Sequence, residues 1–112
     1  MKGANIGELE ELILLTVGIL QDGAYGVSVW QELKEQAGRS INISAVHAVL
    51  NRLEEKGLMK SHMGGATNER GGRRKRYYTL STEGRSAIEE MKLLRDKLYS
   101  QLPQASFNFS PL

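Results

Sequence analysis

The apolar residues of this chain recur mostly at the spacing of α-helices. Over residues 7–21 they fall at i, i+3, i+4 and i+7, and the first turn is acidic, which predicts an amphipathic helix. A turn signal at residues 22–26 separates this helix from a shorter one that ends near residue 38. A third helix is expected over residues 43–56, where a lysine in the last turn precedes a glycine.

The connection before the third helix is left open by the pattern. Residues 41–43 are apolar, polar and apolar in turn, so a brief strand is one expectation. Asn42 and Ser44 are both residue types that cap helices, and either of them can begin the third helix.

A β-hairpin is predicted next, because residues 58–63 and 74–80 alternate between apolar and polar positions. The segment between them contains four glycines and no large apolar side chain. Five of the seven residues 70–76 are basic. The hairpin is therefore expected to carry a long basic loop, in which glycines let the backbone approach a ligand closely.

A last helix is expected to begin at Ser81 or Thr82 and to end before Pro103. Its apolar residues are spaced four, three and four positions apart, as in a short coiled coil. We interpret it as a dimerisation arm, because a small domain has little core left for it to cover; packing on the first helix is the alternative. The residues expected at the dimer interface are Leu9, Ala87, Met91, Leu94, Leu98 and Leu102.

The first helix also carries apolar residues outside its main stripe, at Leu14, Leu15 and Ile19. A helix that is apolar on more than one side packs against more than one neighbour. A second partner, such as another subunit, is therefore expected for this helix.

Composition excludes several classes of protein. A chain of 112 residues is expected to form one domain. The longest mostly apolar stretch, residues 12–20, is well short of the roughly 20 residues that span a bilayer, and no signal-peptide pattern is present. Because the chain has no cysteine, it has no disulfide and no thiolate metal site. We expect a cytoplasmic protein without metal or cofactor.

Catalytic motifs are also missing from the sequence. The glycine-rich segment lacks the Gly-Lys-Ser or Gly-Lys-Thr of a phosphate-binding loop, and the two histidines are not part of an HExxH motif. Dispersed serines and aspartates do not indicate a catalytic triad. We therefore expect no enzymatic activity.

Charge is distributed unevenly along the chain. Residues 39–76 contain nine lysines and arginines and three acidic residues, a net charge of +6, whereas the whole chain carries +2. The remainder is therefore −4. This segregation favours a surface that binds a polyanion, although a run of charges is also typical of a solvated face.

Together these elements predict a mainly α fold with a small β-hairpin, the winged helix-turn-helix. We expect a DNA-binding domain over residues 1–80, a dimerisation helix over 81–103 and a flexible tail over 104–112. The third helix is the candidate recognition helix, because an α-helix fits the major groove of B-DNA. The residues expected to contact DNA are Asn42, Ser44, Ala45, His47 and Asn51 on or beside this helix and Arg70, Arg73, Arg74 and Lys75 on the wing.

Two further residues of the hairpin have a structural interpretation. Arg76 is expected either to contact DNA or to pair with Glu54 or Glu55 inside the fold. His62 is expected to be a solvated residue of the hairpin.

Four segments of the chain resemble, in order and spacing, the PadR family of bacterial transcriptional regulators. They are Leu9-Glu10-Glu11-Leu12-Ile13-Leu14, Ala24-Tyr25-Gly26, residues 50–58 (LNRLEEKGL) and residues 70–81 (RGGRRKRYYTLS). The resemblance implies a winged-helix homodimer of the compact type, usually a repressor of a neighbouring gene or operon. In some members a small phenolic or drug-like ligand releases the operator. Where the family commonly has a tyrosine in the third helix, this chain has His47, so the operator sequence cannot be carried over.

A dimer of this kind implies a mechanism. Two recognition helices related by a twofold axis would read a pseudo-palindromic double-stranded operator, with entries into the major groove about 34 Å apart. A small aromatic effector bound between the subunits would act by favouring one angle between the arms. Trp30 and Tyr99 are the candidate residues for such a pocket, and packing in the core and in the dimer is their alternative role.

The alternative function is a protein–protein interaction adaptor that uses the winged helix without binding DNA. An adaptor does not need the cluster of cations on the wing, so neutralising that cluster would leave its partner binding intact.

Overall fold

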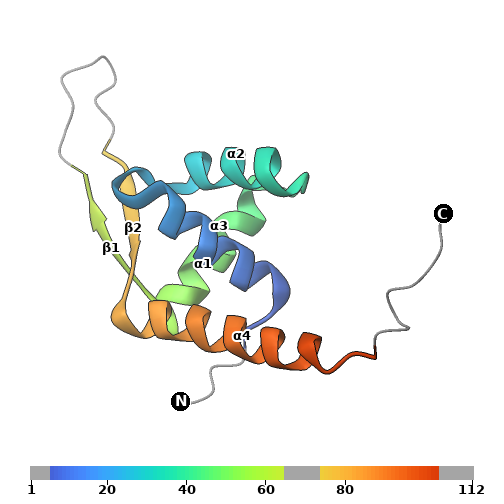
Figure 1. The fold of residues 1–112 in the computed structure, drawn as a ribbon. Helices are drawn as coiled ribbons and strands as arrows, with labels where there is room; N and C mark the ends of the chain where they lie inside the picture. The colour runs from blue at the N-terminus through green and yellow to red at the C-terminus, as the bar shows by residue number, and fades with distance from the viewer. Residues whose placement is uncertain (1–5, 65–73, 104–112) are drawn as a thin grey trace.

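The computed structural model describes residues 6–64 and 74–103 of the chain. Over these residues the elements are α1 (Glu8–Leu20), the 3-10 turn η1 (Gln21–Gly23), α2 (Gly26–Ala37), α3 (Ile43–Glu55), β1 (Met59–Met63), β2 (Arg76–Leu80) and α4 (Thr82–Ser100). β1 and β2 pair antiparallel, with Ser61 opposite Tyr78. Figure 1 shows this hairpin to one side of the helices and α4 beneath them. The predicted helices and hairpin are confirmed, with small shifts at their ends.

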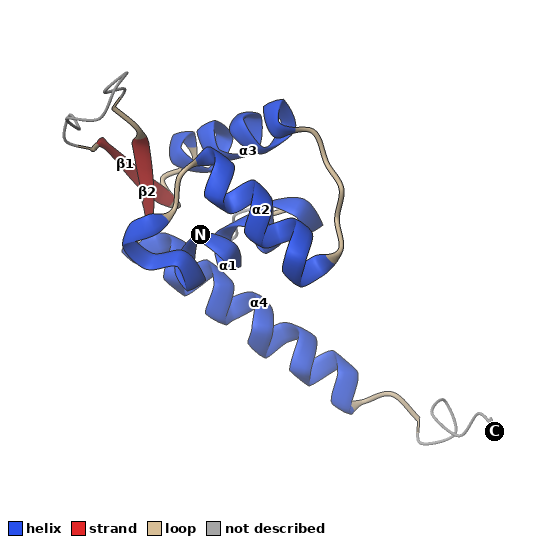
Figure 2. Cartoon of the chain, turned by 90° about the horizontal axis from the view of Figure 1, so that it is seen from above, coloured by secondary structure: helices blue, strands red, loops and turns tan. Residues whose placement is uncertain are grey.

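The hydrophobic core lies among α1, α2 and α3. α1 contacts both of these helices and also α4, and Figure 2 shows it between α2 and α4. The base of the hairpin closes one end of the core. The buried residues are Ile13, Leu14, Val17, Ala24, Val29, Leu33, Val46, Val49, Leu50, Leu53, Leu58, Met59 and Tyr78.

The connection between α2 and α3 is not a strand, and that expectation for residues 41–43 is wrong. Asn42 is the N-cap of α3, because its side-chain oxygen accepts a hydrogen bond from the Ser44 backbone N–H at 3.0 Å. The carbonyl oxygen of Ile41 accepts one from the indole N–H of Trp30 at 2.7 Å. These bonds hold the segment as the turn that sets the start of α3.

The start of α4 is fixed against the turn that links α3 to β1. Gly57 in this turn has a φ of +79°, a conformation that glycine adopts without strain. The Ser81 hydroxyl donates a hydrogen bond to the Gly57 carbonyl at 2.7 Å, and the Ser81 N–H donates one to the Leu58 carbonyl at 3.2 Å. Ser81 also caps α4, since its hydroxyl accepts from the Gly84 N–H at 3.0 Å.

The far half of α4 extends beyond the body of the protein, as Figure 2 shows. Ala87 and Ile88 pack against the core, but the apolar side chains nearer the end of the helix are exposed. Those exposed side chains are Leu93, Leu94, Leu98, Tyr99 and Leu102. Among the helices that the structure describes, none is both long and apolar enough to cross a membrane.

α1 uses its extra apolar residues in two different ways. Leu14 is fully buried in the core of the same chain, whereas Leu15 is 39% exposed and Ile19 is 55% exposed. For Leu14, the expected second neighbour of α1 is the core of the same chain. Leu15 and Ile19 are on the surface, so the expectation of another subunit against them stays a prediction.

We predict that Gly84→Ala lowers the free energy of unfolding by about 1–3 kcal/mol, the usual cost of overpacking. A Cβ at Gly84 would overlap the backbone carbonyl of Leu58, which cannot rotate away. Urea unfolding measures the effect. Gly23→Ala is the matched control, because no atom lies within 4 Å of a Cβ at that position. Equal stability of the two variants would contradict the packing described here.

Candidate nucleic-acid interface

The first turn of α3 is organised by its cap. The Asn42 side-chain oxygen accepts hydrogen bonds from both the backbone N–H and the hydroxyl of Ser44, the latter at 2.7 Å. Both residues are exposed at the start of the helix, and Ala45 beside them is half-buried. The predicted contacts Asn42 and Ser44 are therefore bonded to each other in the free protein.

The outward face of α3 carries His47 and Asn51, both exposed. Its opposite face is buried in the core. His47 lies directly on Gly26, the first residue of α2, so that a Cβ on Gly26 would overlap the imidazole ring. The lack of a side chain at Gly26 is thus what lets the recognition helix and the start of α2 approach each other here.

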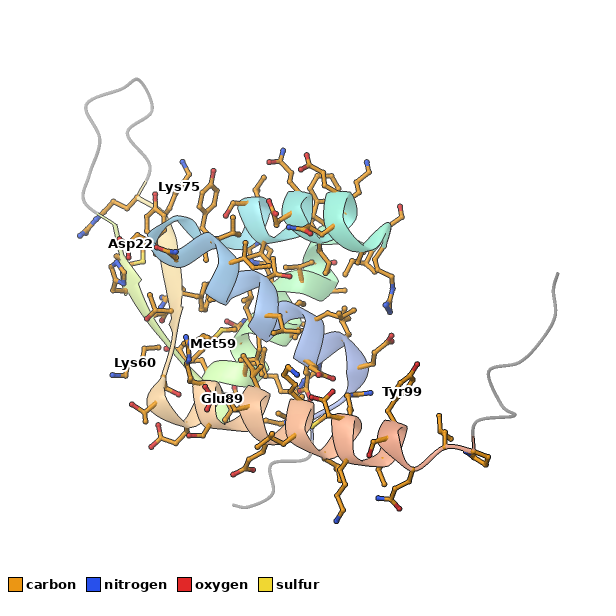
Figure 3. The ribbon with its side chains drawn as sticks, in the orientation of Figure 1. Asp22, Met59, Lys60, Lys75, Glu89 and Tyr99 are labelled. Carbon is orange, nitrogen blue, oxygen red and sulfur yellow. The ribbon has the colours of Figure 1, made fainter. Side chains whose placement is uncertain are left out.

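β2 is attached to the start of α2 by backbone and aromatic contacts. The Tyr78 N–H donates to the Ala24 carbonyl at 2.8 Å, and the rings of Tyr25 and Tyr77 meet edge to face at 5.5 Å between centroids. The Lys75 ammonium lies 5.1 Å from the centroid of the Tyr25 ring, and Figure 3 shows Lys75 where the wing approaches α2. His62 is exposed, as expected, and also stacks on Tyr77.

Arg74 and Arg76 are bonded within the hairpin. The Arg74 Nε–H donates to the Gly64 carbonyl at 3.1 Å, across the two strands. Arg76 donates to the Ser61 hydroxyl at 2.9 Å, and that hydroxyl donates to a Glu54 carboxylate oxygen at 2.7 Å. The predicted pairing of Arg76 with Glu54 is therefore made through Ser61.

Tyr78 connects the wing to the recognition helix. Its phenol is buried and donates a long hydrogen bond, 3.5 Å, to the side-chain oxygen of Asn51. Burial raises the pKa of the Tyr78 phenol, with Arg76 acting against this and Glu54 adding to it. Tyr78 therefore stays protonated and able to donate.

These parts form a concavity of about 590 Å³ between the start of α2, the outward face of α3 and β2. It is lined by Tyr25, Gly26, Val27, His47, Asn51, Lys75, Arg76 and Tyr78. Of the predicted DNA contacts it brings together His47, Asn51 and Lys75. Asn42, Ser44, Ala45 and Arg74 do not line it, and the predictions for Arg70 and Arg73 lie outside the described residues.

The site contains residues that were not among the predicted contacts. Tyr25, Gly26 and Val27 were identified only as a turn and the helix after it, although Tyr25 and Gly26 belong to one of the segments that carry the family resemblance. Tyr78 lines the site as well, although it also belongs to the buried core. That resemblance was the available signal, because nothing in the local pattern says that the start of α2 faces β2.

The cations of the region fall into two groups. On α3, Arg52 and Lys56 form ion pairs with Glu10 of α1, at 3.2 Å and 3.0 Å. Within residues 6–64 and 74–103, Arg74, Lys75 and Arg76 form no ion pair with a carboxylate. The positive charge of Arg74, Lys75 and Arg76 is therefore available to an external anion. Much of the positive charge at the end of α3 is instead neutralised by Glu10.

Glu10 is buried at the start of α1 and holds the end of α3. It also accepts a hydrogen bond from the Gly7 N–H at 2.9 Å. Burial acts to raise the pKa of Glu10, but the Gly7 bond and the charges of Lys56 and Arg52 outweigh it, so this pKa lies below its ordinary value. The ionised carboxylate is thus part of the folded structure.

Among the residues that the structure describes, Trp30 and Tyr99, the aromatic residues proposed for an effector pocket, line neither the concavity beside α3 nor the two cavities beside α4. The indole N–H of Trp30 is bonded to Ile41, and Lys34 lies over its ring at 5.5 Å. Tyr99 is 64% exposed near the end of α4. Trp30 thus holds the turn before α3 through its indole N–H, and its role in an effector pocket stays a prediction.

A family model described as the transcriptional regulator PadR-like family matches residues 14–90, more than half of the chain. The chain belongs to the PadR-like family of transcriptional regulators. This confirms the resemblance found in the sequence. The family consists of regulators, not enzymes, and among the described residues no group of His, Asp and Glu could hold a metal ion.

Known proteins similar to this PadR-like chain include solved structures. A PadR family transcription regulator from Clostridium difficile R20291 is 26% identical, with 84% of this chain and 93% of that one covered and a TM-score of 0.71. An uncharacterized protein from Lysinibacillus sphaericus is 31% identical over 87 residues, 76% of this chain and 75% of the relative. Bacillus subtilis PadR in complex with operator DNA shares the fold, with a TM-score of 0.61 at 18% identity over 94% of this chain and 50% of that one.

We predict that Glu10 makes the stability of this PadR-like protein depend on acid pH. Because the folded pKa is lowered, the stabilisation is complete above the ordinary value of 4.5 and is lost as the pH falls through the folded pKa. Glu10→Gln should cost about 1–3 kcal/mol of unfolding free energy at neutral pH, and the difference from wild type should shrink by about pH 3.

Urea unfolding at the two pH values measures this difference. Glu89→Gln is the control, because Glu89 forms an exposed ion pair with Arg85 and should contribute little at either pH. A difference between wild type and Glu10→Gln that does not change with pH would refute the assignment.

Proposed function

We propose that this protein is a sequence-specific DNA-binding repressor that acts as a homodimer. The observation that carries the proposal is the concavity in which Lys75, just before β2, and Arg76, its first residue, lie beside the polar face of α3. Double-stranded DNA offers both chemistries that such a surface needs, phosphates for the cations and base edges in the major groove for the helix.

The wing is the second part of the DNA-binding surface in this proposal. Arg74 and Lys75 lie just before β2, at the loop end of the hairpin, and Arg70 and Arg73 precede them in the basic run of the sequence. Guanidinium groups suit phosphates and narrow minor grooves. We therefore assign the same role to Arg70 and Arg73. The operator complex of Bacillus subtilis PadR supports this use of the shared fold.

The dimer is proposed to form through α4. Leu94 is 52% exposed and Leu98 is 55% exposed on the arm that extends from the body, and both belong to the predicted coiled-coil seam. Leaving such a stripe in water is unfavourable by about 25 cal/mol for each Å² of apolar surface. A second arm packed antiparallel or crossed on the seam would cover it and would place two recognition helices on one face of DNA, about 34 Å apart.

Relief of repression by a small ligand is the regulatory part of the proposal. A cavity of about 570 Å³ lies between α4 and the body and is lined by Leu58, Ala87, Met91 and Leu94 among others. A ligand there would touch both the arm and the turn that follows α3. It could thereby favour one arm angle over another.

We predict that the protein enriches a twofold-symmetric motif from a pool of random duplexes and that its affinity falls steeply with salt. Lys75→Gln should weaken binding and reduce the slope of log affinity against log salt by about 1 per chain, because one phosphate contact is lost. Arg73→Ala/Arg74→Ala should reduce the slope further. Fluorescence anisotropy at two salt concentrations measures these slopes.

Lys97→Gln is the matched control, since it removes the same charge from the last turn of α4, far from the wing. It should leave the slope unchanged. Absence of an enriched motif together with salt-independent behaviour would favour the protein–protein interaction adaptor instead.

We predict that Leu94→Asp/Leu98→Asp converts the dimer into a folded monomer. Neither side chain belongs to the core, so the body should keep its helical circular dichroism while the sedimentation coefficient falls to that of one chain. Ser100→Asp places a new carboxylate on the face of α4 opposite the seam and should remain dimeric. A double variant that still sediments as a dimer would show that α4 is not the interface.

A further inference from the structure

Among the described residues that line the concavity, His47 is the only histidine. The other ionisable residues that line it are Tyr25, Tyr78, Lys75 and Arg76. Tyrosine, lysine and arginine side chains ordinarily titrate near pH 10 or above, whereas an imidazole changes charge between about pH 5 and pH 8. By side-chain type, His47 is therefore the candidate for a change of charge at physiological pH among the described lining residues.

The position of the imidazole is defined by its neighbours. It lies on the backbone of Gly26 at the start of α2, where the helix dipole is positive. The charged groups on the same concavity are Lys75, just before β2, and Arg76 of β2, and from α3 the neighbour is the neutral Asn51. Among the residues that line the concavity there is no carboxylate. A protonated His47 therefore has no anionic partner there in the free protein.

We propose that DNA binding takes up a proton at His47, which makes the affinity for DNA increase as the pH falls through neutrality. This inference rests on the proposed function. A duplex across the concavity would bring the negative charge of its phosphates and of the acceptors in its major groove close to the imidazole, and a nearby opposite charge favours the charged form of a titrating group. By linkage, a site that is more often protonated in the complex strengthens binding at lower pH. His47 thus adjusts binding strength, while Lys75 and Arg76 provide charge that does not vary.

The expected size of the effect follows from the same linkage. If the phosphates favour the imidazolium by one pKa unit, the affinity per bound chain is up to about tenfold higher near pH 6 than near pH 8. In a dimer, each of the two His47 side chains contributes this change in affinity.

The test measures affinity by fluorescence anisotropy between about pH 6 and pH 8 at constant ionic strength, on the duplex recovered from the random pool. His47→Gln keeps a hydrogen-bond donor but cannot be protonated, so its affinity should not follow the pH in the way that wild type does. His47→Lys carries a fixed charge and should bind more tightly than His47→Gln at the high-pH end, also without the pH slope.

His62→Gln is the matched control, because it removes the other histidine of the chain, from β1, and should keep the wild-type slope. Thermal unfolding of each variant establishes that it is folded. The same pH slope in His47→Gln and wild type would overturn the inference while leaving DNA binding intact. If the wild-type protein recovers no duplex from the random pool at any pH, the proposed function and this inference are overturned together.

Discussion

The close contact between the start of α4 and the turn after α3 is the constraint on which the arrangement depends. Gly84 lies against the carbonyl of Leu58, and Ser81 bonds to Gly57 and Leu58 while capping α4. The end of α3, the start of β1 and the start of α4 therefore meet at one closely packed point. In the proposed dimer, a change in the angle of α4 would be transmitted directly to α3 and the wing through this contact.

Glu10 adds a second constraint on the same helix. Its carboxylate ties α1 to the last turn of α3 through Arg52 and Lys56, and the next residue, Glu11, forms an ion pair with Arg95 of α4 at 2.7 Å. Two adjacent carboxylates thus connect α1 to the recognition helix and to the arm. The cations of the basic segment therefore have two roles. Arg52 and Lys56 of α3 form ion pairs within the fold, whereas residues 74–76 at the loop end of the hairpin are exposed.

Local patterns predicted the elements well because helix periodicity, capping and turn chemistry act over a few residues. The interpretation failed at residues 41–43, where an alternating pattern is too short to distinguish a strand from a capped turn. It was also uncertain for Trp30, since a large aromatic residue on an amphipathic helix fits a pocket or a packing role equally well. The bond from its indole to Ile41 shows a structural role for Trp30 that the pattern did not reveal.

The sequence by itself determined the order of helices and wing, the basic character of the middle segment, the apolar seam of the arm and the family. Each of these is a property of neighbouring residues or of composition. Only the tertiary structure decided that His47 lies on Gly26, that Lys75 reaches Tyr25 and that Glu10 takes up the charges of α3. These contacts join residues far apart in the chain, and which side chains meet depends on the angles at which the elements pack.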